Sequence, residues 1–180
     1  MARLFIAIDL PDDVKKEISA IRSDLPGARW VSEHQLHLTL RFVGDTDDAL
    51  LGNLKEQLGA IDFPSFSMSL EGVGYFPGRG VPRILWAGLA APPPLIALQW
   101  AIEQACVAAG TLPDERHFSP HITIARLREP ASAAVSAFAR MNAGFRSRPF
   151  ESTAFHLYAS TLNTNGAVHT ILKTYPCLPS

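Results

Sequence analysis

The sequence contains few cysteines and lacks the short motifs of the commonest hydrolases. Its two cysteines, Cys106 and Cys177, form neither a CxxC pair nor another metal-type spacing. There is no HExxH motif of a zinc hydrolase and no GxSxG motif of a serine hydrolase. Any function should therefore depend on other residues, and we expect neither a metal ion nor a cofactor.

Long hydrophobic runs are also missing. The apolar N-terminal segment is interrupted by Asp9 and then by Pro11, which makes it too short for a signal peptide or a membrane span. It is better interpreted as a first buried strand. With 47% hydrophobic and 18% charged residues among 180, we expect a single globular domain. We further expect a cytoplasmic monomer that does not contact membranes.

No large excess of either charge is present. The formal net charge of −1 argues against a broad basic surface for nucleic acid. Basic residues are nevertheless concentrated in residues 116–150, which hold six arginines and only Glu129 as an acid. Guanidinium groups suit phosphate recognition, although codon bias in a GC-rich genome would produce the same arginine content.

The pattern of turns and apolar residues predicts two similar passes of strands and helices. The first pass has strands at 3–9, 36–43 and 65–75, with helices at 11–25 and 46–58. The second has strands at 83–89, 121–126 and 150–160, with helices at 92–109 and 131–141, and a last strand follows at 168–175. The predicted fold class is α+β, with β-α-β-α-β duplicated over about 1–80 and 81–175. We expect two pseudo-symmetric lobes, each with a mainly antiparallel sheet facing a central cleft and helices outside.

The most informative feature is a repeated tetrapeptide. His37-Leu38-Thr39-Leu40 recurs 84 residues later as His121-Ile122-Thr123-Ile124. Alternation along a strand places each His and its Thr on one face and the apolar residues on the other. One such histidine would most simply be a structural residue with a satisfied hydrogen bond. Two copies at equivalent places of a duplication favour a functional site.

Among the chemistries open to two histidines and two threonines, phosphodiester hydrolysis fits best. Zinc would need further ligands, and nucleophilic catalysis would need an activated Ser or Cys. Hydrolysis needs one imidazole to accept a proton from water and another to donate one to the leaving oxygen. Two hydroxyls can donate to the phosphoryl oxygens as charge develops on them.

These motifs resemble those of the 2H phosphoesterase superfamily. The segments 37–44 and 120–126, together with 3–11, Trp30 and 82–88, are similar to the RNA 2′,3′-cyclic phosphodiesterases, also called 2′-5′ RNA ligases. The resemblance implies hydrolysis of a terminal 2′,3′-cyclic phosphate to a 2′-phosphomonoester. It also implies that His37 is the proton donor, that His121 is the acceptor, and that Thr39 and Thr123 hold the phosphoryl oxygens. The near-symmetry of the motifs leaves the donor and acceptor interchangeable at this stage.

Three further residues are candidates for substrate binding. Arg41 shares strand parity with His37 and Thr39. Arg126 follows the second motif as in the family, but its parity differs from that of His121, so it reaches the cleft only if the strand ends or bulges there. Phe42 could stack on a base, although its apolar-face position is more typical of a core residue.

Several functions share these features. The expected substrates are RNA ends or small cyclic nucleotides. Ligation to a 2′-5′ linkage would use the same two histidines in reverse, and a cyclic nucleotide or oligonucleotide could be the natural substrate of the hydrolysis. A non-catalytic nucleotide- or RNA-binding module is the third possibility, although both His-Thr pairs are intact.

Overall fold

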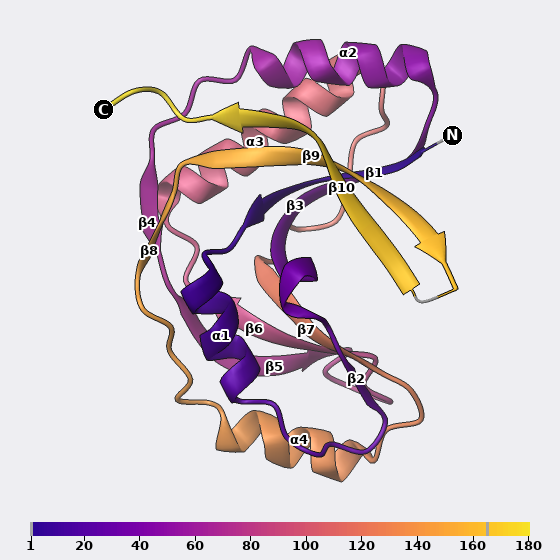
Figure 1. Cartoon of the computed structure of the whole chain (residues 1–180), viewed down its shortest axis with the longest axis vertical. Helices are drawn as coiled ribbons and strands as arrows, with labels where there is room; N and C mark the ends of the chain where they lie inside the picture. The colour runs from indigo at the N-terminus through magenta and orange to yellow at the C-terminus, as the bar shows by residue number, and fades with distance from the viewer. Residues whose placement is uncertain (1, 165) are drawn as a thin grey trace.

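The computed structural model describes residues 2–164 and 166–180. It contains four α-helices, one short 3₁₀ helix (η1) and ten strands in those residues (Figure 1). The helices are α1 (Asp12–Ala20), η1 (Glu33–Gln35), α2 (Asp48–Gly59), α3 (Pro93–Ala109) and α4 (Ser132–Met141). The strands are β1 (Ala2–Asp9), β2 (Ala28–Trp30), β3 (His37–Thr46), β4 (Phe66–Met68), β5 (Leu70–Phe76), β6 (Ile84–Leu89), β7 (His121–Leu127), β8 (Phe150–Ser152), β9 (Ala154–Asn163) and β10 (Gly166–Pro176).

Two four-stranded sheets form the body of the molecule, and every strand pair in them is antiparallel. Sheet A has the order β10-β9-β1-β3 and sheet B the order β2-β7-β6-β5. Strands β4 and β8 form a short third sheet. Strand β3 of sheet A packs near β7 of sheet B, and α4 lies beyond sheet B at the far end from α2 and α3 (Figure 1). The predicted fold class, α+β with two antiparallel sheets, is confirmed.

The lobes do not coincide with the two sequence repeats. Sheet A combines β1 and β3 from the first repeat with β9 and β10 from the second, whereas sheet B combines β2 and β5 with β6 and β7. Strand β5 of the first repeat therefore lies beside β6, which begins the second repeat, and β9 of the second repeat lies beside β1. Helix α3 crosses over in the same way, since it follows β6 of sheet B and packs on β3 of sheet A. Each of the two sheets is therefore built from strands of both sequence repeats.

Local sequence signals explain where several helices begin and end. The Asp47 carboxylate accepts a hydrogen bond from the backbone N–H of Leu50 at 2.8 Å and caps α2. Pro92 precedes α3, and Gly110 ends it with a φ of 116°. Helix α1 stops at Ala20 rather than near Leu25, and the short strand β2 was not anticipated from the sequence.

One hydrophobic core joins the two sheets. It includes apolar residues from the inner faces of β1, β3, β6 and β7, together with the apolar faces of all four α-helices. Leu38 and Ile122, the second residues of the two repeated motifs, are completely buried in it. Their burial directs the flanking His and Thr side chains to the opposite face. None of the helices in the described residues is long and apolar enough to cross a membrane.

Candidate active site

Both repeated motifs open onto one cleft between the sheets. Strands β3 and β7 each begin at the histidine of a motif. The cleft has a volume of about 650 Å³, and His37, Thr39, His121 and Thr123 all line it. All four side chains are partly exposed, whereas the alternating apolar residues are buried. The structure thus brings together the four residues that the repeated motif singled out.

The two imidazole rings are held by equivalent hydrogen bonds. Nδ1 of His37 lies 2.7 Å from the carbonyl oxygen of Gln35, and Nδ1 of His121 lies 2.7 Å from that of Ser119. A carbonyl oxygen can only accept, so each Nδ1 must carry the hydrogen. In the neutral ring Nε2 then has a free lone pair, and in the charged ring it has an N–H. Each histidine can therefore act as a base or as an acid through Nε2.

Aromatic rings fix the orientation of both histidines. The His37 ring stacks on Phe5 with centroids 4.9 Å apart, and the His121 ring meets Phe76 edge-on at 5.1 Å. Burial lowers the pKa of His37 to about 4, and the nearby His169 adds to this effect. His37 is therefore neutral at pH 7 when the cleft holds no anion.

A β-bulge in each strand reverses the side-chain alternation after the motif. Ile6 pairs with Arg41 and Ala7 with Thr39, which leaves Leu40 as an extra residue in β3. Leu85 pairs with Ala125 and Trp86 with Thr123, which leaves Ile124 as an extra residue in β7. The two extra residues, Leu40 and Ile124, are 84 residues apart, like the motifs themselves. The duplication thus extends to the backbone irregularity.

The bulges decide which flanking residues reach the cleft. Phe42 lines the cleft and is 57% exposed, so the more ordinary expectation of a core position is wrong. Arg126, at the equivalent place in β7, also lines the cleft. Arg41 does not, and its predicted place beside His37 and Thr39 is wrong because the bulge turns its side chain into the core.

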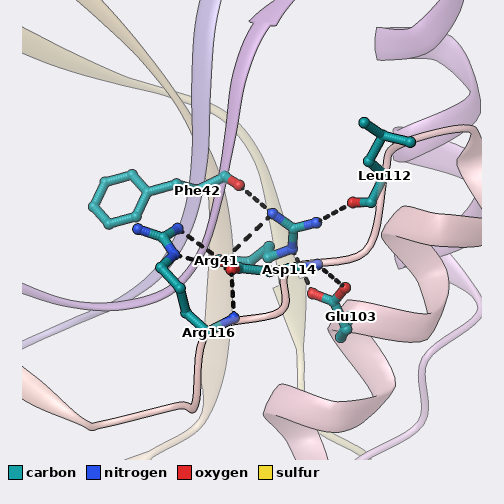
Figure 2. A network of polar contacts seen from close by, with 6 residues as sticks. All are labelled: Arg41, Phe42, Glu103, Leu112, Asp114 and Arg116. Atoms are coloured by element: carbon teal, nitrogen blue, oxygen red, sulfur yellow. Dashed lines mark hydrogen bonds and ion pairs between the residues drawn. The ribbon is translucent and has the colours of Figure 1, made fainter.

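Arg41 instead forms a buried polar network (Figure 2). Its Nε lies 2.5 Å from the Glu103 carboxylate, and its two terminal nitrogens donate to the carbonyl oxygens of Phe42 and Leu112. The other Glu103 oxygen accepts from the backbone N–H of Asp114 at 2.8 Å. Hydrogen bonds from Arg116 lower the pKa of Asp114 to about 2. The network ties β3, which carries His37, to the loop that leads to His121.

Other cleft residues were not identified from the sequence. They come from strands β1, β2 and β10, which carry no repeated motif, and from the turn before β3: Arg3, Arg29, Trp30, Gln35 and His169. The His169 ring is 5.4 Å from that of His37, and the Gln35 amide donates to the carbonyl oxygen of Ala167. No acidic side chain lines the cleft in the described part of the chain. Only the pairing of distant strands brings these residues together, so local patterns did not reveal them.

Comparison with known proteins gives consistent matches over most of the chain. A family model described as the 2′-5′ RNA ligase superfamily matches residues 10–163. An RNA 2′,3′-cyclic phosphodiesterase of Thermotoga maritima is 34% identical over 183 residues, covering 97% of this chain and 94% of that protein. The protein of the same name from Escherichia coli is 32% identical over 177 residues, covering 96% and 95%.

A solved structure has the same architecture. The crystal structure of Escherichia coli LigT complexed with 3′-AMP superposes with a TM-score of 0.82 at 29% sequence identity, covering 99% of both chains. The structural similarity therefore extends over both sheets of this chain.

Proposed function

This chain belongs to the 2′-5′ RNA ligase superfamily, and from this membership we propose that it hydrolyses the 2′,3′-cyclic phosphate at RNA ends to a 2′-phosphomonoester. Relatives named RNA 2′,3′-cyclic phosphodiesterase align with nearly its whole length. One observation carries the proposed mechanism. Two histidines with Nδ1 bound to carbonyl oxygens line a single cleft together with two threonines.

The proposed reaction uses the two Nε2 atoms on opposite sides of the phosphate. Nε2 of His121 accepts a proton from a water molecule, whose oxygen then forms a bond to phosphorus. The bond from phosphorus to the 3′-oxygen breaks, and Nε2 of His37 donates its proton to that oxygen. The product carries the phosphate on the 2′-oxygen, and each histidine ends with the opposite protonation state. Exchange with solvent restores both.

The remaining site residues bind the substrate in this proposal. Thr39 and Thr123 donate hydroxyl hydrogen bonds to the non-bridging phosphoryl oxygens, where one preorganised donor contributes about 3 kcal/mol in the transition state. Arg126 supplies a positive charge to a substrate phosphate, and the exposed ring of Phe42 offers a face for base stacking.

A proton donor must be protonated before the reaction, but burial keeps His37 neutral in the substrate-free protein. The negative charge of a bound phosphate opposes the effect of burial and raises the pKa of His37. Substrate binding and protonation of His37 are thus coupled in this proposal, in which the donor role of His37 follows from the resemblance of its motif to the family.

The test is hydrolysis of an oligonucleotide ending in a 2′,3′-cyclic phosphate. His37→Ala and His121→Ala should each lower kcat by at least about a hundredfold, because each removes one proton-transfer group. His156→Ala is the matched control, since His156 lies outside the cleft and bonds the Thr174 hydroxyl. EDTA should leave the activity unchanged. Full activity in either cleft variant would refute the mechanism.

Ligation to a 2′-5′ linkage is the same phosphoryl transfer with a 5′-hydroxyl of RNA in place of water: its oxygen forms the bond to phosphorus, and the bond from phosphorus to the 3′-oxygen breaks. Incubating cyclic-phosphate ends with 5′-hydroxyl RNA and separating the products would measure both reactions. Binding of mononucleotides with no turnover of any cyclic substrate would instead favour a non-catalytic module.

A further inference from the structure

A third histidine, His169 of β10, lies in the cleft beside His37. The centroid of its ring is 5.4 Å from that of His37 and 4.9 Å from that of Phe5, and it meets both rings edge-on. The Phe5 and His37 rings stack on each other, so the three rings form one cluster. His169 is only partly buried and lines the cleft. A ligand in the cleft can therefore reach its ring.

The ring nitrogens of His169 lack the partner that the other histidines of the strands have. Nδ1 of His37 and of His121 is bound to a carbonyl oxygen, and Nδ1 of His156 lies 2.9 Å from the Thr174 hydroxyl. In the described part of the chain, no hydrogen bond or ion pair involves the His169 ring. A polar group that is partly removed from water gains free energy when it finds a partner. His169 can thus bind a ligand without giving up a bond within the protein.

Gln35 links the backbone near His169 to the turn that holds His37. Its carbonyl oxygen accepts from Nδ1 of His37, while its side-chain amide donates to the carbonyl oxygen of Ala167, two residues before His169. Strand β10 is also paired with β9, where Ser160 is the register partner of His169. These hydrogen bonds fix the position of His169 relative to His37.

Arg126 lies close to the place of the reacting phosphate. Thr123 pairs with Trp86 of β6. Arg126 pairs with Ile84, because the bulge at Ile124 takes up one residue of β7. Arg126 is therefore only two ladder positions from Thr123, and both side chains line the cleft. A phosphate held by Thr123 is thus also near Arg126.

The charged groups around His169 favour an anion from outside. The titratable and charged side chains in the cleft and beside it are Arg3 of β1, Arg29 of β2, His34 of η1, His37 of β3, His121 and Arg126 of β7, and Tyr158 of β9. No carboxylate lines the cleft among the described residues, and Asp9 at the end of β1 is bound to Lys15 at 2.8 Å. Burial, Arg126 and His34 lower the pKa of His169, so its ring is neutral at pH 7 in the free protein. A bound anion would oppose all three effects.

We propose that His169 takes up a proton from solvent when the substrate binds and donates a hydrogen bond from its charged ring to the reacting phosphate. It is then a substrate-binding histidine, in addition to the proton donor and the proton acceptor. The inference rests on the proposed function, since that function places the phosphate between His37 and Arg126. A charged ring suits this reaction, because the cyclic diester carries one negative charge whereas the product phosphomonoester carries nearly two.

The direct test is sulfate binding measured by calorimetry, because sulfate stays a dianion between pH 6 and pH 8. His169→Gln keeps a neutral N–H donor but cannot become charged. It should bind sulfate about tenfold more weakly than the unmodified protein at pH 6, and within about threefold of it at pH 8. At pH 6.5 the unmodified protein should also take up at least about half a proton more per sulfate, measured in two buffers of different ionisation enthalpy.

Two further variants separate charge from packing. His169→Phe keeps an aromatic ring against Phe5 and removes every N–H, so it should lose sulfate affinity at pH 6 while its thermal unfolding stays close to that of the unmodified protein. His156→Gln is the matched control, since His156 lies outside the cleft on the neighbouring strand. Its sulfate affinity should follow that of the unmodified protein at every pH.

Hydrolysis of adenosine 2′,3′-cyclic phosphate gives a kinetic readout. In His169→Gln, kcat/KM should be about tenfold lower than in the unmodified protein at pH 6, and the deficit should shrink as the pH rises to 8. A merely structural role would lower kcat/KM by the same factor at every pH.

The outcomes separate the two proposals. If the pH dependence of sulfate binding is the same with and without His169, the inference is overturned, and turnover of the cyclic substrate leaves the proposed function intact. A loss of the same factor at pH 6 and pH 8 would overturn it as well. Absence of turnover by the unmodified protein would overturn the proposed function, while sulfate binding would still decide whether His169 binds an anion through its charged ring.

Discussion

The backbone carbonyls of Gln35 and Ser119 determine how the two histidines can react. Each accepts a hydrogen bond from Nδ1 of the histidine two residues later. Proton transfer to or from the substrate must therefore take place at Nε2. The two rings nevertheless have different surroundings, because His37 contacts both Phe5 and His169 whereas His121 contacts Phe76. Equivalent motifs thus have unequal environments, which is what a donor and an acceptor require.

Anion binding should raise the pKa of His37. The pKa is about 4 in the free protein because burial disfavours the charged ring. A sulfate ion in the cleft should raise it by about one unit or more, since an opposite charge nearby favours the charged ring. By linkage, sulfate should bind more tightly as the pH falls from 7 to 5. NMR titration of the ring protons with and without sulfate measures the shift.

His156 is the internal control for this titration. Burial lowers its pKa as well, but its ring lies outside the cleft and bonds Thr174. Its pKa should be the same with and without sulfate. If sulfate leaves the pKa of His37 unchanged, His37 cannot be the donor and the two roles must be exchanged.

At the scale of single elements, the β-bulges in β3 and β7 have the greatest effect on the site. Each adds one residue, so the side chain that would have faced the cleft enters the core and the next one faces the cleft. In β3 this buries Arg41 and exposes Phe42, and in β7 it buries Ala125 and exposes Arg126. A buried arginine then needs a partner, which α3 supplies as Glu103.

Removing the arginine of this buried pair should destabilise the protein. Arg41→Met leaves the Glu103 carboxylate buried without its counter-charge, and the free energy of unfolding should fall by about 3–5 kcal/mol. Arg116→Ala is the matched control, because Arg116 is 72% exposed in its ion pair and its loss should cost less than about 1 kcal/mol. Urea unfolding followed by circular dichroism measures both variants. A loss below 1 kcal/mol in Arg41→Met would show that the network does not contribute as a buried ion pair.

At the scale of the whole molecule, the two repeats are interleaved rather than adjacent. Strand β1 lies between β3 of its own repeat and β9 of the other, and β6 lies between β7 and β5 in the same way. The cleft lies between the two sheets, so both repeats contribute to each of its walls. One continuous core follows from this exchange.

The isolated first repeat should therefore not fold. Residues 1–80 contain β2 and β5, but their neighbours in sheet B, β7 and β6, belong to the second repeat. The fragment 1–80 should show the narrow amide dispersion of an unfolded chain by NMR, and co-expression with 81–180 should restore the native spectrum. A folded 1–80 fragment would contradict the interleaved architecture.

Much of the site was predictable because its key residues repeat within regular strands. Alternation places His37 with Thr39 and His121 with Thr123, and this local geometry does not depend on the rest of the fold. The positions of Arg41 and Phe42 were not predictable, since nothing in Leu40-Arg41-Phe42 signals the bulge. Arg126 had been expected in the cleft only if its strand bulged, and it does.

The sequence by itself determined most of the strands and helices and the duplicated His-Thr pairs, because these follow from side-chain periodicity and from turn and capping residues. The local turn before each motif set the tautomers of the two histidines, through a carbonyl oxygen two residues earlier. The tertiary structure decided the partner of Arg41 and the pairing of Arg29 with Arg126. Each of these depends on a register or an approach between distant segments, and their free energies are set by burial and by neighbouring charge. The periodicity of a local segment contains no information about strand register or about which distant charges lie nearby.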